Sequence, residues 1–128
     1  MEEPTIGQLE REISNRIRSL YNVKLGQRIG RIICHFFDTQ LAITIENSVT
    51  LAEQTILRSG NDVLAEKVRL DIDKIIKPLL KDTIEEVINK PVIELMSYTS
   101  LTSGRTAITA ILEQPPVVRN PRAIPKAN

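Results

Sequence analysis

The chain has 128 residues, a formal net charge of +1, two Tyr, two Phe and no Trp. A chain of this length fits one domain with a single core. The balanced charge and the scarcity of aromatic rings give no support for nucleic acid as a partner. No apolar run reaches the roughly 18 residues of a membrane span. We therefore expect a soluble, cytoplasmic protein without a transmembrane segment.

The first predicted element is an amphipathic helix from Ile6 to Tyr21. Thr5 is a suitable N-cap, because its hydroxyl can accept a hydrogen bond from the Gln8 amide. The Gln8 side chain can in turn accept one from the Thr5 amide. Apolar residues at steps of three and four form one stripe, namely Ile6, Leu9, Ile13, Ile17 and Leu20. This helix should pack on a core.

A glycine-containing connection and a β-hairpin follow this helix. Gly26 is expected to adopt a positive φ in the connection 22–30. The segment from Arg31 to Phe37 is apolar on both faces and rich in β-branched and aromatic residues, which predicts a well-covered strand. The segment from Leu41 to Glu46 alternates with period two and predicts the second, half-buried strand of the hairpin.

The next predicted element is a short helix that ends at Arg58. Thr50 or Ser48 can cap it, and Gly60 is suited to the position after its end. Its expected buried residues are Ala52, Ile56 and Leu57.

A long amphipathic helix over Asn61 to Asn89 dominates the middle of the chain. Pro78 lacks an amide and crowds the carbonyl of Lys74, so we expect a kink or a break near Lys77. The predicted apolar stripe contains Leu64, Val68, Ile72, Ile75, Ile76, Leu79, Ile84, Val87 and Ile88. A helix of this length can cover a small sheet.

A second strand pair is predicted over Val92 to Tyr98 and Arg105 to Leu112, with a polar turn that includes Gly104. The expected fold is therefore α+β: a four-stranded, mostly antiparallel sheet of two hairpins, covered by the N-terminal helix, the short helix and the long Pro-kinked helix. The domain should occupy residues 1–113. Residues 114–128 hold four prolines and three basic residues, and predict a flexible or polyproline-like tail that buries little.

Few residues suggest chemistry. Cys34 and His35 are adjacent, so on a strand they face opposite sides and cannot act as nucleophile and base. The single cysteine excludes an intrachain disulfide, and this pair cannot complete a zinc site, so no metal or cofactor is expected. Both residues are interpreted as packed side chains.

One candidate site for an anionic ligand remains. It would combine the turn carrying Gly26, Arg28 and Arg31 with the helix start at Thr50 and Glu53. The alternative interpretation is that the glycine forms an ordinary turn, the arginines are solvated and Thr50 is a plain helix cap. No catalytic residue is assigned, and the sequence favours a protein that is not an enzyme.

Several segments resemble the MpsC-like family of small bacterial proteins, whose name refers to a sodium-translocating, membrane-potential-generating system. The matching pieces are Lys24 to Gln27, Val49 to Glu53, Leu64 to Arg69 and Asn89 to Tyr98. The resemblance covers about Ile6 to Glu113. It implies an accessory piece of an ion or inorganic-carbon transport system. The chain departs from the family pattern at Gln27, where proline is usual, and at Tyr98-Thr99, where an aspartate is often expected.

Two functional interpretations follow. The preferred one is a non-enzymatic binding, regulatory or accessory subunit that acts through a protein partner, which could be membrane-associated. The alternative is a sensor of a small anionic ligand, or a weak enzyme, that uses the turn at Gly26–Arg31 and the helix start at Thr50. Neither face of Ile33 to Phe37 nor of Ala107 to Leu112 is clearly polar, and the helices cover one face of the sheet more readily than two, so we also expect a homodimer. It would form through the uncovered face or by pairing of a strand edge.

Overall fold

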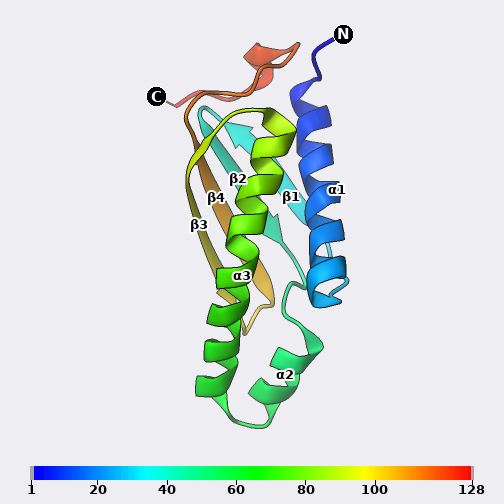
Figure 1. The fold of residues 1–128 in the computed structure, drawn as a ribbon, viewed down its shortest axis with the longest axis vertical. Coiled ribbons are helices and arrows are strands. Elements are labelled where there is room, and N and C mark those ends of the chain that lie inside the picture. Colours follow the sequence, from blue (N-terminus) through cyan, green and yellow to red (C-terminus); the bar gives the residue numbers. More distant parts are fainter. Residues whose placement is uncertain (1, 128) are drawn as a thin grey trace.

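The computed structural model describes residues 2–127. It contains three α-helices and one four-stranded antiparallel sheet, as the sequence predicted (Figure 1). The elements, in chain order, are α1 (Ile6–Leu25), β1 (Ile32–Phe37), β2 (Gln40–Ile45), α2 (Leu51–Arg58), α3 (Asp62–Ile88), β3 (Val92–Ser100), β4 (Arg105–Leu112) and the 3-10 turn η1 (Pro121–Ala123). The strands lie in the order β1-β2-β4-β3, so each hairpin places one strand at an edge and the two hairpins meet through β2 and β4.

Helix α1 begins with the predicted capping box. The Gln8 amide donates to the Thr5 hydroxyl at 3.1 Å, and the Thr5 amide donates to the Gln8 side chain at 2.8 Å. The helix ends one turn later than predicted, at Gly26, which has a φ of 63°. An L side chain is strained in that left-handed conformation, which explains the glycine.

Helix α3 runs from Asp62 to Ile88 as one element with Pro78 inside it. Of the two expected alternatives, a break near Lys77 is therefore wrong, and a kink stays a prediction. Packing of the helix on the sheet compensates for the amide that Pro78 lacks, because burial outweighs the roughly 3 kcal/mol cost of an interior proline. The helix ends at Asn89, whose φ is 55°.

Four residues of the predicted stripe of α3 are buried as expected, namely Ile76, Ile84, Val87 and Ile88. The stripe is otherwise rotated toward Ala65 and Leu80, which were not predicted. Leu64 and Ile75 are 41% and 61% exposed, while Ile72 and Leu79 are partly buried. In α2 the predicted Ala52 is exposed, and the only fully buried side chain is that of Glu53. A wide apolar surface leaves the exact rotation of a helix undetermined by periodicity alone.

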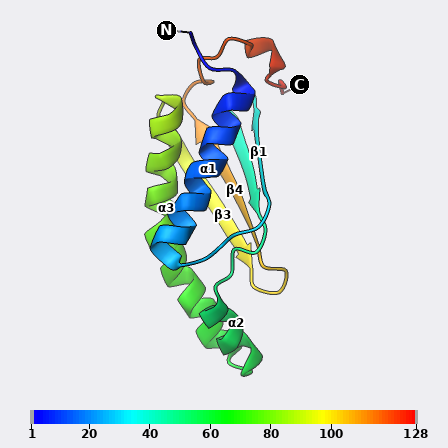
Figure 2. The ribbon, with the colours of Figure 1, turned by 90° about the vertical axis from the view of Figure 1, so that its right-hand side faces the viewer.

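The core lies between α1, α3 and one face of the sheet. Figure 2 shows both helices on the same side of the strands. The strand residues that face them are buried: Cys34, Phe36, Leu41, Ile43, Ile45, Leu95, Ile108, Ala110 and Leu112. The opposite face has no helix over it among residues 2–127.

The C-terminal segment crosses one end of the domain (Figures 1 and 2). Val118 and Ile124 are 6% and 2% exposed and belong to the core. The Arg119 amide donates to the Pro4 carbonyl at 2.9 Å, and Asn120 accepts from the Ile6 amide at 2.8 Å. The expectation that this segment buries little is therefore wrong. Its prolines remove sheet donors, but its remaining amides and two apolar side chains find partners on the domain.

Candidate functional site

The second face of the sheet has no helix over it among residues 2–127. Strand register places twelve side chains there, and we call this set the open face: Ile33, His35 and Phe37 of β1, Gln40, Ala42 and Thr44 of β2, Glu94, Met96 and Tyr98 of β3, and Ala107, Thr109 and Ile111 of β4. The edge strands carry large exposed apolar side chains, since Phe37, Met96 and Tyr98 are 43%, 45% and 72% exposed. Exposed apolar side chains that lie together make this face a candidate interaction surface.

The size of the side chains changes across the open face. The register aligns Ile33, Thr44, Ala107 and Tyr98 in one row across the four strands. The next row aligns His35, Ala42, Thr109 and Met96. In these two rows small residues occupy the two central strands, and larger residues occupy both edges. The third row places the larger Gln40 and Ile111 at the centre, between Phe37 and Glu94. The centre of the face is therefore lower than its edges over the first two rows.

Charged residues lie at both ends of the open face. Beyond Ile33, the Glu46 amide donates to the Arg31 carbonyl at 2.9 Å, and the Arg105 guanidinium lies 3.4 Å from the Glu46 carboxylate. Glu94 stands at the other end, opposite Ile111. One end thus carries two arginines and one glutamate, and the other carries a carboxylate.

The two strand edges are protected differently. On β1 the Phe36 amide donates to the Glu10 carboxylate at 3.0 Å, and just beyond it the Asp38 amide donates to the Pro125 carbonyl at 2.7 Å. On β3 the Val92 amide donates to Glu85 at 2.8 Å, at the start of a nine-residue strand. A blocked edge cannot pair with another strand. The β1 edge is therefore closed by α1 and the C-terminal segment.

His35 is not packed as predicted. Its side chain is 71% exposed, and its Nδ1 lies 3.6 Å from the Glu10 carboxylate. Cys34, on the opposite side of β1, is buried as predicted, and desolvation raises the pKa of its thiol to about 12. The neutral thiol is a poor nucleophile at ordinary pH.

A buried ion pair joins α2 to α3. The Arg69 Nε donates to Glu53 at 2.8 Å, and a terminal nitrogen of Arg69 donates to the other Glu53 oxygen at 2.6 Å. The Glu53 and Arg69 side chains are 0% and 5% exposed. Arg69 also donates to the Ser48 carbonyl at 3.1 Å. This two-bond geometry orients α2 against α3 and against the loop that follows β2.

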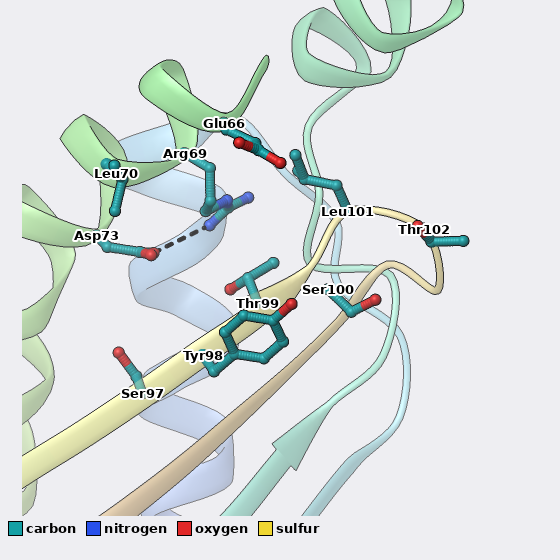
Figure 3. A pocket seen from close by; sticks show the side chains of 10 residues that line it. All are labelled: Glu66, Arg69, Leu70, Asp73, Ser97, Tyr98, Thr99, Ser100, Leu101 and Thr102. Carbon is teal, nitrogen blue, oxygen red and sulfur yellow. Dashed lines mark hydrogen bonds and ion pairs between the residues drawn. The ribbon is translucent and has the colours of Figure 1, made fainter. Parts of the chain in front are cut away.

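A cavity of about 350 Å³ lies beside this pair, between α3 and the end of β3 (Figure 3). Arg69, Asp73 and Glu66 approach it from α3, and residues 97–102 form its other wall. Asp73 lies 3.4 Å from Arg69. Desolvation raises the pKa of the Asp73 carboxyl, although the Arg69 charge opposes that shift. Since Arg69 is already paired with Glu53, the cavity offers little positive charge to an anionic ligand.

A chain of three buried hydroxyls lies close to the ion pair. Ser48 and Thr106 are 2.7 Å apart, and Thr106 and Thr99 are 2.6 Å apart. Ser48 also donates to the Gly104 carbonyl at 3.0 Å. The neighbouring Tyr21 is buried, and desolvation raises its pKa to about 12. These bonds satisfy polar groups and fix the β3–β4 turn against the loop after β2.

The structure brings together only part of the sequence-predicted anion site. The amides of Gly26 and Gly30 donate to the carbonyls of Asn22 and Glu46 at 3.0 and 2.7 Å, so they are not turned toward a ligand. Arg28 and Arg31 are exposed.

Thr50 and Glu53 form a separate pair. The Thr50 amide and hydroxyl both lie 3.0 Å from one Glu53 oxygen, and the Glu53 amide donates to the Thr50 hydroxyl at 3.2 Å. Their polar groups are thus used in the capping box and in the pair with Arg69. The anion site stays a prediction, with its two exposed arginines as the groups left to test.

Sequence reasoning missed Arg69. The signal was its position, four residues after Ala65 and seven before Ile76, which places a charge on the buried stripe of α3. A charge at such a position requires a buried partner. The partner could not be identified from spacing, because Glu53 belongs to another helix.

The described part of the chain, residues 2–127, contains no helix that is long and apolar enough to cross a membrane. Within the same residues, no group of three or more His, Cys, Asp or Glu side chains is placed to hold a metal ion.

Comparison with known proteins gives one match. The family model described as "Na+-translocating membrane potential-generating system (MpsC)" matches residues 5–114, which is most of the chain. No curated protein and no solved structure matches.

Proposed function

The chain belongs to the MpsC family, and we propose that it is a non-enzymatic accessory subunit that acts by binding a protein partner. The family description names a sodium-translocating, membrane-potential-generating system, so the proposed partner is a component of such a system. The observation that carries the proposal is the open face. A conformation that leaves Phe37, Met96 and Tyr98 in water is costly unless another protein covers them.

The arrangement of charges also favours binding over chemistry. The buried charges of Glu53 and Arg69 neutralise each other through two short hydrogen bonds. The raised pKa values of Cys34 and Tyr21 keep both groups protonated near neutral pH. These polar groups therefore serve to hold the fold that presents the open face.

We further propose that two copies of the chain pair through β3. Glu10 and Pro125 occupy amides at the β1 edge, which leaves β3 as the edge strand suited to pairing. Antiparallel pairing of β3 with its copy would create one eight-stranded sheet around a two-fold axis. The two open faces would then remain available to the partner.

Site-specific photocrosslinking tests the proposed function. A photoreactive amino acid replaces Ala107, in the centre of the open face, and is activated in cells that contain the native membrane system. We expect crosslinks to a protein of that system. The matched control carries the same group at Lys67, an exposed position of α3. Equal products from both positions, or no crosslinked protein from Ala107, would contradict the proposal.

A further inference from the structure

We propose that the occupant of the open face is one amphipathic helix of the partner, lying along the strands with its C-terminus at Arg31 and Arg105. This inference rests on the proposed function and specifies the kind of partner segment. It follows from the dimensions of the face, its size profile and its charges.

The dimensions of the face match a helix. Four strands at about 4.8 Å spacing place the β1 and β3 axes roughly 14 Å apart. An α-helix with its side chains is about 10 Å across. The strands extend about 20 Å between the Arg31 end and the Glu94 end, at about 3.3 Å per residue, which corresponds to roughly 13 helical residues at 1.5 Å each.

The size profile favours a helix over a second sheet. Ala42 and Ala107 make the centre low in two of the three rows, where Met96 and Tyr98 form the β3 edge, while Gln40 and Ile111 fill the centre of the third row. A convex cylinder can place Leu or Phe side chains over the two alanines and contact both edges at once. Two copies of the same face would meet at their edges and leave a void over the alanines, which forfeits dispersion contacts.

The charges at the ends of the face set the direction of the helix. Arg31 and Arg105 outnumber Glu46 at one end, and Glu94 stands at the other. A helix carries partial negative charge at its C-terminus and partial positive charge at its N-terminus. The favourable orientation therefore places the C-terminus of the partner helix at the two arginines and its N-terminus at Glu94.

Synthetic peptides provide the test. The first probe is a peptide of about 14 residues with leucines at helical spacing, lysines in its first turn and glutamates in its last turn. The second probe has the same leucines with the two charged turns exchanged. Both are titrated into the full-length protein by calorimetry at low salt. We expect the first peptide to bind at least about 5-fold more tightly than the second. The second peptide pairs its charged turns with the two ends only in the reversed direction, in which its macrodipole opposes the charges of the face.

Two variants make the test specific. Ala42→Trp fills the centre of the open face and should weaken binding of the first peptide at least about 10-fold. Ala52→Trp, at an exposed position of α2, is the matched control and should leave binding unchanged. The double variant R31Q/E94Q removes the net charge at both ends and should reduce the preference between the two peptides to about 2-fold or less. Circular dichroism and thermal melts verify that each variant is folded.

Three results would overturn the inference. These are no binding of either peptide, equal affinity of the two peptides, or binding that Ala42→Trp leaves intact in a folded protein. Mapping of the photocrosslinked partner separates this inference from the proposed function. A crosslinked partner segment that is a strand or loop would refute the helix and retain the binding subunit. Absence of any crosslinked partner would refute the proposed function itself.

Discussion

Arg69 of α3 and Glu53 of α2 form a buried ion pair through two hydrogen bonds of 2.8 and 2.6 Å. The pair fixes a helix of eight residues that otherwise buries little apolar surface, since Glu53 is its only fully buried side chain. The same glutamate completes the capping box with Thr50. One carboxylate thus sets both the start of α2 and its docking on α3.

Removal of Glu53 should be strongly destabilising. Glu53→Ala leaves the Arg69 charge buried without its main partner, and we expect a loss of about 3–5 kcal/mol in the free energy of unfolding. Urea denaturation measures this loss in the free energy of unfolding. The double variant E53M/R69L should recover much of this loss, because no unpaired charge remains. Glu12→Ala, which breaks the exposed pair with Arg16, is the control and should cost about 1 kcal/mol or less. A loss for Glu53→Ala as small as that of the control would refute this role.

The burial pattern of α3 predicts opposite outcomes for neighbouring isoleucines. Ile76 is 2% exposed and Ile75 is 61% exposed. Ile76→Ala should lower the free energy of unfolding by about 2–5 kcal/mol because it opens a cavity in the core. Ile75→Ala should change it by about 0.5 kcal/mol or less. Chemical denaturation of both variants measures the difference, and similar losses would show that the rotation of α3 is wrong.

Truncation after Glu113 should lower the melting temperature by several degrees. The deletion removes Val118 and Ile124 from the core and frees the amides of Ile6 and Asp38. Ile124→Ala isolates the apolar part and should cost about 2–4 kcal/mol. Val117→Ala, at a 53% exposed position of the same segment, is the control. An unchanged melting temperature after truncation would instead support the flexible tail that the sequence predicts.

The proposed homodimer should have twice the mass of one chain when it is measured by light scattering at micromolar concentration. Three variants each replace one residue of β3, namely Glu94, Met96 or Tyr98, with cysteine. If β3 pairs with its copy, at least one of these variants should form an interchain disulfide under mild oxidation. Opposed residues of antiparallel strands lie about 4.5–5.5 Å apart between Cα atoms, which suits a disulfide. The buried Cys34, with its raised thiol pKa of about 12, should not interfere. Ala42→Cys, on a central strand, is the control. A monomer at high concentration would contradict the homodimer.

Asp73 should make stability depend on pH in the direction opposite to most carboxylates. Burial raises the pKa of its carboxyl in the folded state, so the folded protein holds this proton more tightly than the unfolded chain. The protonated carboxyl of Asp73 therefore stabilises the folded protein at a pH below the pKa that Asp73 has in the unfolded chain. This stabilisation is lost as the pH rises through the pKa that Asp73 has in the folded protein. Asp73→Asn should gain stability relative to the wild type as the pH rises through the acidic range. Denaturation at several pH values measures this difference, and a relative loss of stability by the variant would show the opposite shift.

The sequence by itself determined the order and type of the elements. Thr5 with Gln8, Thr50 with Glu53, and Gly26 mark helix ends through local hydrogen bonds and backbone conformation, which neighbouring residues decide. Both hairpins were also predictable, because alternation with period two and short polar turns are local features.

Tertiary structure decided which surfaces are covered and which charges are paired. Arg69 pairs with Glu53, which lies 16 residues earlier in the sequence. The packing of α3 on the sheet determines which side of that helix is buried. The same packing stabilises α3 as one continuous helix, although Pro78 lies inside it. Ile124 is buried in the core, although the prolines of residues 114–128 predicted a free tail. Each of these outcomes depends on burial against residues distant in the chain, and no local pattern contains that information.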